Sequence, residues 1–152
     1  MMSAELVFTI ANNGILPFWL LLIFAPRWRG TEIAVHSIAI PVILGLAYLW
    51  LLARITIGGK GAPGTSFFSL PGVMALFTSP TAATMGWIHY LIFDLFIGAW
   101  IARDAARRGM SHWIAAPCLI VTLFAGPVGL LLYFVVRLAL GRGGFLLAEQ
   151  AA

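Results

Sequence analysis

The most chemically suggestive residue in this chain is an acid, Asp94, that lies in a long apolar stretch. It is the only Asp, Glu, Lys or Arg among residues 61–102. Ionisable side chains are costly inside a membrane, so such a residue is a functional candidate. Its carboxyl group could act as a general acid or base or bind a cation. It could equally hold two helices together through a hydrogen bond.

Two neighbours of Asp94 have side chains that can exchange protons. Tyr90 precedes it by four residues and therefore shares its stripe on a helix. His89 precedes it by five residues, which places the two side chains roughly 140° apart around a helix. They cannot share one narrow face, but both can border the interior of a helix bundle. Histidine exchanges protons near neutral pH, although a buried histidine can also be purely structural.

Further polar and aromatic residues are predicted at comparable depth in the membrane. A rise of about 1.5 Å per residue places His89 roughly 20 Å from the end at residue 102, and Asp94 at roughly 12 Å. The two asparagines of the first apolar stretch fall near the level of His89, and prolines can open a helix backbone to ligands. We therefore predict a ligand site that is lined by Asn12, Asn13, Pro17, His36, Trp87, Tyr90 and Pro127.

The elements that must position these residues are membrane helices. The 152 residues are 62% hydrophobic and 9% charged, whereas soluble domains are about 25% charged. Charged residues separate four long uncharged runs, each long enough for the roughly 20 residues that a spanning helix needs. Backbone groups in lipid must pair internally, which favours helices. We predict one all-α domain over residues 1–152, with four transmembrane helices at about 4–25, 32–53, 80–102 and 113–137.

The segment between the second and third predicted spans is apolar but short. Residues 66–79 are predicted to form an interfacial or re-entrant helix, because 14 residues are too few to span a bilayer. A loop that rests on the lipid headgroups is an equal alternative. Ser79 followed by Pro80 is a typical start signal for the next helix.

The basic residues give a weak indication of orientation. Four spans would put five arginines on the side of the short loops near residues 27–29 and 103–108, and four basic residues on the other side. The dense short loops favour that side as cytoplasmic. The first apolar run is too long for a signal peptide and follows Glu5 instead of basic residues, so we expect a retained span. Because the chain is short and shows no transit peptide, we expect a bacterial inner-membrane protein.

Several classes of site are excluded or disfavoured. A single cysteine, Cys118, excludes an intrachain disulfide and a cysteine-based zinc site. The glycine-rich segment at residues 58–65 lacks the flanking strand and helix of a phosphate-binding loop. We predict no cofactor and no metal, although a haem or metal site that uses His36, His89 or Asp94 is a weaker alternative. The basic loops suit lipid headgroups and not nucleic acid.

Parts of the chain resemble a known family. Residues 81–96, TAATMGWIHYLIFDLF, together with Arg103-Asp104 and Gly126-Pro127-Val128-Gly129, resemble the abscisic-acid-deficient-four-like family. Leu16-Pro17 and the Phe77-x-Ser79 pattern extend this resemblance over nearly the whole chain. Plant members of the family are chloroplast proteins required for neoxanthin synthesis. The resemblance implies a four-helix integral membrane protein that binds or modifies carotenoids.

The resemblance also implies a type of chemistry. Conversion of violaxanthin to neoxanthin opens an epoxide, removes a proton from the adjoining polyene carbon and forms an allene. This needs a proton donor for the oxygen and a base for the carbon-bound proton. The resemblance implies Asp94 as the acid and His89 as the base, with Asn12 and Asn13 orienting the oxygen. The substrate expected here is another epoxy- or hydroxy-carotenoid.

Two functions stay open from the sequence. One is a carotenoid isomerase of the neoxanthin-synthase type. The other is a non-catalytic subunit that binds a carotenoid or another lipid-like ligand in a pigment–protein complex, surrounded by membrane lipids. Gly98 and Ala102 form a small-xxx-small pair that could support packing within the chain or in a homo-oligomer.

Overall fold

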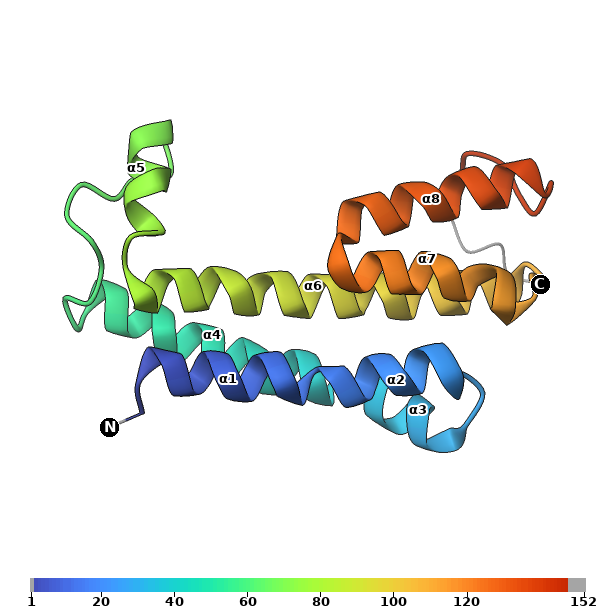
Figure 1. Cartoon of the computed structure of the whole chain (residues 1–152), viewed down its shortest axis with the longest axis horizontal. Helices are drawn as coiled ribbons and strands as arrows, with labels where there is room; N and C mark the ends of the chain where they lie inside the picture. Colours follow the sequence, from blue (N-terminus) through green and yellow to red (C-terminus); the bar gives the residue numbers. More distant parts are fainter. Residues whose placement is uncertain (1, 148–152) are drawn as a thin grey trace.

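The computed structural model describes residues 2–147, and within that range it contains eight helices and no strand. Two rods are each made of two consecutive helices: α1 (Ala4–Gly14) with α2 (Leu16–Phe24), and α3 (Arg29–Val35) with α4 (Ala39–Thr56). The third rod is α6 (Pro80–Arg107), and the rods run alongside one another (Figure 1). Three stretches are long and apolar enough to cross a membrane: Ala4–Phe24, Arg29–Thr56 and Pro80–Arg107.

Helix α6 is the centre of the fold, since α1, α4, α7 and α8 all pack against it. It begins as its sequence predicts, with Pro80 at the first position and the Ser79 hydroxyl accepting a hydrogen bond from the Ala82 N–H at 3.4 Å. Gly98 allows the buried Trp19 ring of α2 to lie directly on the helix. A Cβ at Gly98 would stand only 2.7 Å from Cη2 of Trp19.

The predicted fourth span at residues 113–137 is wrong. The chain there forms two antiparallel helices, α7 (His112–Phe124) and α8 (Gly126–Ala139), which pack on each other as a hairpin (Figure 1). Pro127 lacks an N–H, and its ring would collide with the carbonyl four residues earlier in a continuous helix. Ala125 instead takes φ −155° and ψ 77°, and the chain reverses there.

The two helices of this hairpin are too short to cross a bilayer one at a time. They have 13 and 14 residues, which is roughly 20 Å each against a hydrocarbon core of about 30 Å. Gly129 lets them approach closely, because a Cβ there would overlap the side chain and backbone of Thr122. The described chain therefore has three candidate spans and a hairpin, in place of four spans.

The segment predicted to be interfacial or re-entrant contains one short helix, α5 (Leu70–Leu76), which projects away from α6 (Figure 1). Its seven residues are roughly 10 Å long, which is too short for a re-entrant helix. The prediction of a re-entrant helix is therefore wrong. The large apolar side chains of the segment are exposed: Phe67, Phe68, Leu70, Met74 and Phe77. Contact of this surface with the lipid interface stays a prediction.

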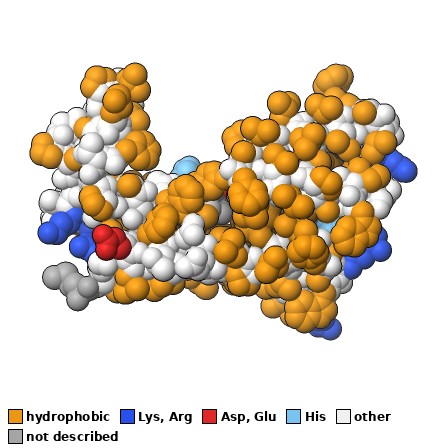
Figure 2. Space-filling model, in the orientation of Figure 1, with side chains coloured by type: hydrophobic (Ala, Val, Ile, Leu, Met, Phe, Trp, Pro, Cys, Tyr) orange, Lys and Arg blue, Asp and Glu red, His pale blue; other side chains and the backbone are white. Residues whose placement is uncertain are grey.

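The hairpin changes the charge count at the two ends of the molecule. It returns the chain to the end where α6 finishes, so Arg137 and Arg142 lie there with the five arginines near residues 27–29 and 103–108 (Figures 1 and 2). At the opposite end Arg54 donates to the Met2 carbonyl at 2.8 Å, and Ser79 donates to the Lys60 carbonyl at 2.7 Å. Seven of the nine basic residues thus share one end.

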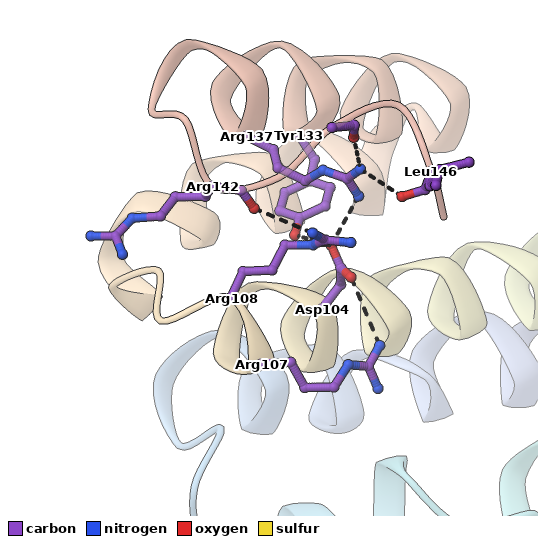
Figure 3. A network of polar contacts seen from close by, with 8 residues as sticks. Asp104, Arg107, Arg108, Tyr133, Arg137, Arg142 and Leu146 are labelled. Atoms are coloured by element: carbon purple, nitrogen blue, oxygen red, sulfur yellow. Dashed lines mark hydrogen bonds and ion pairs between the residues drawn. The ribbon is translucent and has the colours of Figure 1, made fainter. Parts of the chain in front are cut away.

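A buried charge cluster fixes the hairpin to the end of α6 (Figure 3). The Asp104 carboxylate is 3% exposed. Its Oδ2 accepts hydrogen bonds from the Tyr133 hydroxyl at 2.6 Å, from Arg108 Nε at 2.8 Å and from Arg137 Nη1 at 3.2 Å. Because Tyr133 and Arg137 belong to α8, one carboxylate links α6 to the second helix of the hairpin.

Arg137 extends the cluster to the C-terminal segment. Its side chain is 1% exposed, and its Nη2 donates to the carbonyls of Gly144 and Leu146, the latter at 3.0 Å. Removing one partner of such a buried ion pair leaves a charge without compensation, which is strongly destabilising.

We predict that Gly98→Ala destabilises the protein by about 1–3 kcal/mol, because the new methyl group is forced against Trp19. Gly45→Ala is the matched control, since Gly45 also lies in a helix and nothing stands within 4 Å of its Cβ position. That control should be neutral or stabilising by up to about 1 kcal/mol. Thermal unfolding of the purified protein in detergent measures both. Equal effects would contradict the close contact of α2 with α6.

We predict that Asp104→Ala costs about 3–5 kcal/mol, because it leaves Arg137 buried without its carboxylate. Arg107→Ala is the control, since the Arg107 side chain is 38% exposed and its ion pair with Asp104 is 3.8 Å long. An exposed pair of this kind contributes less than about 1 kcal/mol. The same unfolding measurement compares the two variants, and a small loss for Asp104→Ala would show that the cluster does not hold the hairpin.

The hairpin also predicts the sidedness of single cysteines placed in a Cys118→Ala background. Ser111→Cys and Arg142→Cys should react with a membrane-impermeant maleimide from the same side of sealed vesicles, because the hairpin does not cross the bilayer. Lys60→Cys should react from the opposite side. Labelling of positions 111 and 142 from opposite sides would restore a fourth span.

Candidate functional site

The candidate site lies where the α7–α8 turn meets the middle of α6. Asp94 is 6% exposed there, and its carboxyl group accepts a hydrogen bond from the N–H of Gly126, the first residue of α8. The Tyr90 hydroxyl approaches the same carboxyl group and lies 3.4 Å from the Leu123 carbonyl near the end of α7. The second carboxyl oxygen, Asp94 Oδ2, is buried and makes no hydrogen bond within the described chain.

The sequence explains why these two side chains are needed at the turn. Helix ends leave backbone N–H and C=O groups unpaired, and the turn at Ala125 places two helix ends together. Tyr90 and Asp94 stand one helical turn apart on α6, so both can face the break. Gly126 is required by close approach, because a Cβ there would overlap Asp94 Oδ1 and lie 2.6 Å from Cγ.

A recess of about 660 Å³ leads along α1 and α6 to Tyr90. Its walls include Glu5, Phe8 and Phe77, and its floor on α6 runs from Pro80 to Tyr90. Tyr90 therefore connects the recess to Asp94, which stands behind it. In Figure 2 the molecule is hollowed between α5 and the α7–α8 hairpin, with α6 below the hollow.

Aromatic rings line this recess in a row. The Trp87 ring stacks on Tyr90 with centroids 5.1 Å apart, and Phe8 tilts against Trp87 at 5.7 Å. Asn12 of α1 fixes the indole, because its Oδ1 accepts the Trp87 Nε1–H at 3.0 Å. The row gives a polarisable surface that suits an unsaturated ligand.

The structure brings together five of the residues that the sequence predicted for a site. They are Asn12, Trp87, Tyr90, Asp94 and Pro127. Sequence reasoning missed the Phe8 and Phe77 walls, which come from outside the predicted polar set. The helical spacing of Phe8 and Asn12, four residues apart on α1, was a signal that could have identified the first of them.

Four other predicted residues lie elsewhere. His89 is exposed, and its ring centroid is 6.1 Å from that of Tyr48 and 4.6 Å from that of Phe93, so it does not form a pair with Asp94. His36 lies at the arginine-rich end, where its Nδ1 is 2.9 Å from Nη1 of Arg103. Two further residues are exposed: Asn13 and Pro17.

Proton exchange and hydrogen bonding are the chemistry that this site offers. A tyrosine hydroxyl at the end of an apolar recess, with a carboxyl group behind it, can pass a proton to or from a bound molecule. Within residues 2–147 no three His, Cys, Asp or Glu side chains lie together as a metal site.

Comparisons of the sequence with known proteins found a family and a curated relative. A family model described as ABA DEFICIENT 4-like matches residues 6–133. Protein ABA DEFICIENT 4, chloroplastic, from Arabidopsis thaliana is 28% identical over 139 residues, which is 88% of this chain and 61% of the relative. The chain thus spans less than two thirds of the length of that curated relative. No solved structure matches the chain significantly.

The cellular location of the relative differs from the bacterial inner membrane that the sequence led us to expect. Its printed name places it in the chloroplast, so the comparison gives no support for the expected bacterial inner membrane. The family match itself runs from α1 into α8 and includes Asp94 and the Gly126-Pro127 turn. Because it covers most of the sequence, the chain belongs to the ABA DEFICIENT 4-like family.

Proposed function

We propose that this protein binds an oxygenated carotenoid in the membrane and isomerises it through Tyr90 and Asp94. The observation that carries the proposal is a buried, unpartnered carboxyl oxygen, Asp94 Oδ2, behind a tyrosine at the inner end of an aromatic recess. The carotenoid as substrate class comes from the family resemblance. The recess and the proton-exchanging pair support the chemistry.

The recess suits one end group of such a ligand. Its volume of about 660 Å³ and its row of aromatic rings would accept a cyclic end with part of the polyene. A carotenoid is about as long as the hydrocarbon core is thick, roughly 30 Å, so the remainder would extend along α6 into the hollow between α5 and the hairpin (Figure 2). An oxygen on the end group would then meet the Tyr90 hydroxyl.

An epoxide could be isomerised by a single acid–base group in two half-steps. Protonated Asp94 gives its proton through the Tyr90 hydroxyl to the epoxide oxygen, and the carbon–oxygen bond breaks. The electron pair of the adjoining C–H bond forms the second double bond of the allene. The carbon-bound proton returns through Tyr90 to Asp94, so no net proton is consumed. This gives Asp94 the base role that the resemblance implied for His89.

A second function is favoured by the structural role of the same two residues. Asp94 pairs with the first N–H of α8, and the Tyr90 hydroxyl lies near the last carbonyls of α7. Such contacts stabilise the turn whether or not any chemistry occurs. In this alternative the protein holds a carotenoid or another lipid unchanged, as a subunit of a pigment–protein complex.

Conservative variants in a host that makes epoxy-carotenoids separate the two functions. Asp94→Asn keeps an oxygen for the Gly126 N–H but cannot ionise, so conversion should fall by about 100-fold or more. Tyr90→Phe keeps the stacking on Trp87 and should fall by at least about tenfold, because the proton path is cut. His89→Ala is the control and should convert pigment at the wild-type level. Chromatography of extracted pigments gives the rates, after correction for the protein in the membrane.

The outcomes distinguish enzyme from binder. A pigment that copurifies unchanged with the wild type and all three variants would support binding alone. Normal conversion by both Asp94→Asn and Tyr90→Phe would place the chemistry elsewhere, and loss of conversion in His89→Ala alone would restore the histidine as the base.

A further inference from the structure

We propose that Thr9 of α1 recognises a ring hydroxyl on the carotenoid that occupies the recess ending at Tyr90. The inference rests on the proposed function, since it concerns the ligand of the same recess. It narrows that ligand to a carotenoid whose cyclic end carries both an epoxide and a hydroxyl. In this assignment Thr9 determines specificity and takes no part in the proton transfer.

Three of the four side-chain donors that line the recess already donate to groups of the protein. The Thr9 hydroxyl donates to the backbone carbonyl four residues earlier at 2.9 Å, and the Thr84 hydroxyl donates to a backbone carbonyl of α1 at 3.4 Å. The Trp87 Nε1–H donates to Asn12 at 3.0 Å. The fourth donor is the Tyr90 hydroxyl, which the proposed function assigns to the epoxide oxygen.

Thr9 and Tyr90 therefore suit oxygens of different kinds. A threonine hydroxyl that donates to the backbone still has lone pairs with which it can accept a hydrogen bond. An epoxide oxygen has lone pairs and no proton, so it pairs with the Tyr90 donor. A ring hydroxyl has a proton to donate, so it pairs with Thr9 without breaking the bond that Thr9 makes in its own helix.

Thr9 and Tyr90 lie at similar levels on neighbouring helices that run in the same direction (Figure 1). The Phe8 ring lies against Trp87, so a residue of α1 is roughly level with the residue 79 positions later on α6. Thr9 is thus roughly level with Ile88, two residues or about 3 Å before Tyr90. Because both side chains line the recess, a ring held there would have one side at Tyr90 and the other at Thr9.

A ring hydroxyl at this depth needs a partner inside the protein. Thr9 lies five residues into the candidate span Ala4–Phe24, roughly 8 Å along its axis. The recess around it is largely apolar, with walls that include Phe8, Phe77 and Ala83. A hydroxyl without a hydrogen bond is costly in such surroundings. An end group that lacks the hydroxyl leaves Thr9 bonded to its own helix, so it loses only the added bond.

Two epoxy-carotenoids that differ only in their ring hydroxyls test this inference. The probes are violaxanthin, which has an epoxide and a hydroxyl on each ring, and β-carotene diepoxide, which lacks both hydroxyls. Quenching of tryptophan fluorescence in the purified full chain in detergent measures the two affinities. We expect violaxanthin to bind about three- to tenfold more tightly, which is the effect of one neutral hydrogen bond. Comparing this ratio between variants cancels the different solubilities of the two pigments.

Three variants locate the preference. Thr9→Val keeps the shape of the side chain but removes the hydroxyl, so the affinity ratio should fall by about three- to tenfold. Thr9→Ser keeps the hydroxyl and should keep the ratio. Thr56→Val is the matched control: the Thr56 hydroxyl also donates to the carbonyl four residues earlier, at 2.9 Å, but it does not line the recess, so the ratio should not change.

The inference is overturned if the wild type shows no preference for violaxanthin, or if Thr9→Val keeps the full preference. An equal loss in Thr56→Val and Thr9→Val would also overturn it, because the effect would then not come from the recess. If Thr9→Val does not fold, Thr9→Ala is measured in its place, and an unchanged ratio refutes the assignment equally.

Pigment analysis of the same samples separates this inference from the proposed function. A wild type that prefers violaxanthin through Thr9 but converts neither pigment would contradict the isomerase and leave the recognition of the hydroxyl intact. A wild type that converts both pigments and binds them with equal affinity would contradict the role of Thr9 and leave the isomerase intact.

Discussion

The architecture depends on how the backbone N–H and C=O groups are hydrogen-bonded at the α7–α8 turn, where two helix ends meet in the apolar body of the protein. Unpaired N–H and C=O groups in such a place cost several kcal/mol each. Helix α6 provides the partners: Asp94 accepts from the Gly126 N–H, and Tyr90 lies against the Leu123 carbonyl. The reversal of the chain therefore requires a polar pair at mid-α6, and the distribution of arginines follows from that reversal.

This requirement also limits what the pair can do chemically. One carboxyl oxygen of Asp94 is committed to α8, and the other is left buried and without a partner. A residue that served only as a cap could be an asparagine, whose oxygen would accept the same N–H. A carboxyl group adds the ability to hold or release a proton, and Tyr90 carries that ability to the edge of the recess. In the proposed function, the chemistry and the fold thus share the Asp94 side chain, with a separate carboxyl oxygen for each.

The sequence predicted the features of the fold that depend on the lengths of apolar runs and on the positions of charges. It did not predict that the chain reverses within residues 113–137. The three spans predicted at about 4–25, 32–53 and 80–102 correspond closely to the candidate membrane-spanning rods, because the length of an apolar helix can be estimated from the sequence. Hydropathy does not show where a chain reverses, so an apolar run of this length predicts one span even though Pro127 interrupts it. For the site, the spacing of four residues identified Tyr90. The spacing of five residues already separated His89 from Asp94 by roughly 140°, but it could not show that His89 is exposed and not at the interior of the bundle.

In a four-span chain Asp104 lies in a loop, and its buried partner Arg137, which is 33 residues away, would lie at the other membrane surface. The reversal brings the two together, and the distances match along both helices. Asp94 and Asp104 are ten residues apart on α6, roughly 15 Å. Their partners Gly126 and Arg137 are eleven residues apart on α8, roughly 16 Å. Two carboxylates on one helix therefore hold both ends of the other, which sets its register and keeps the turn at the inner end of the recess.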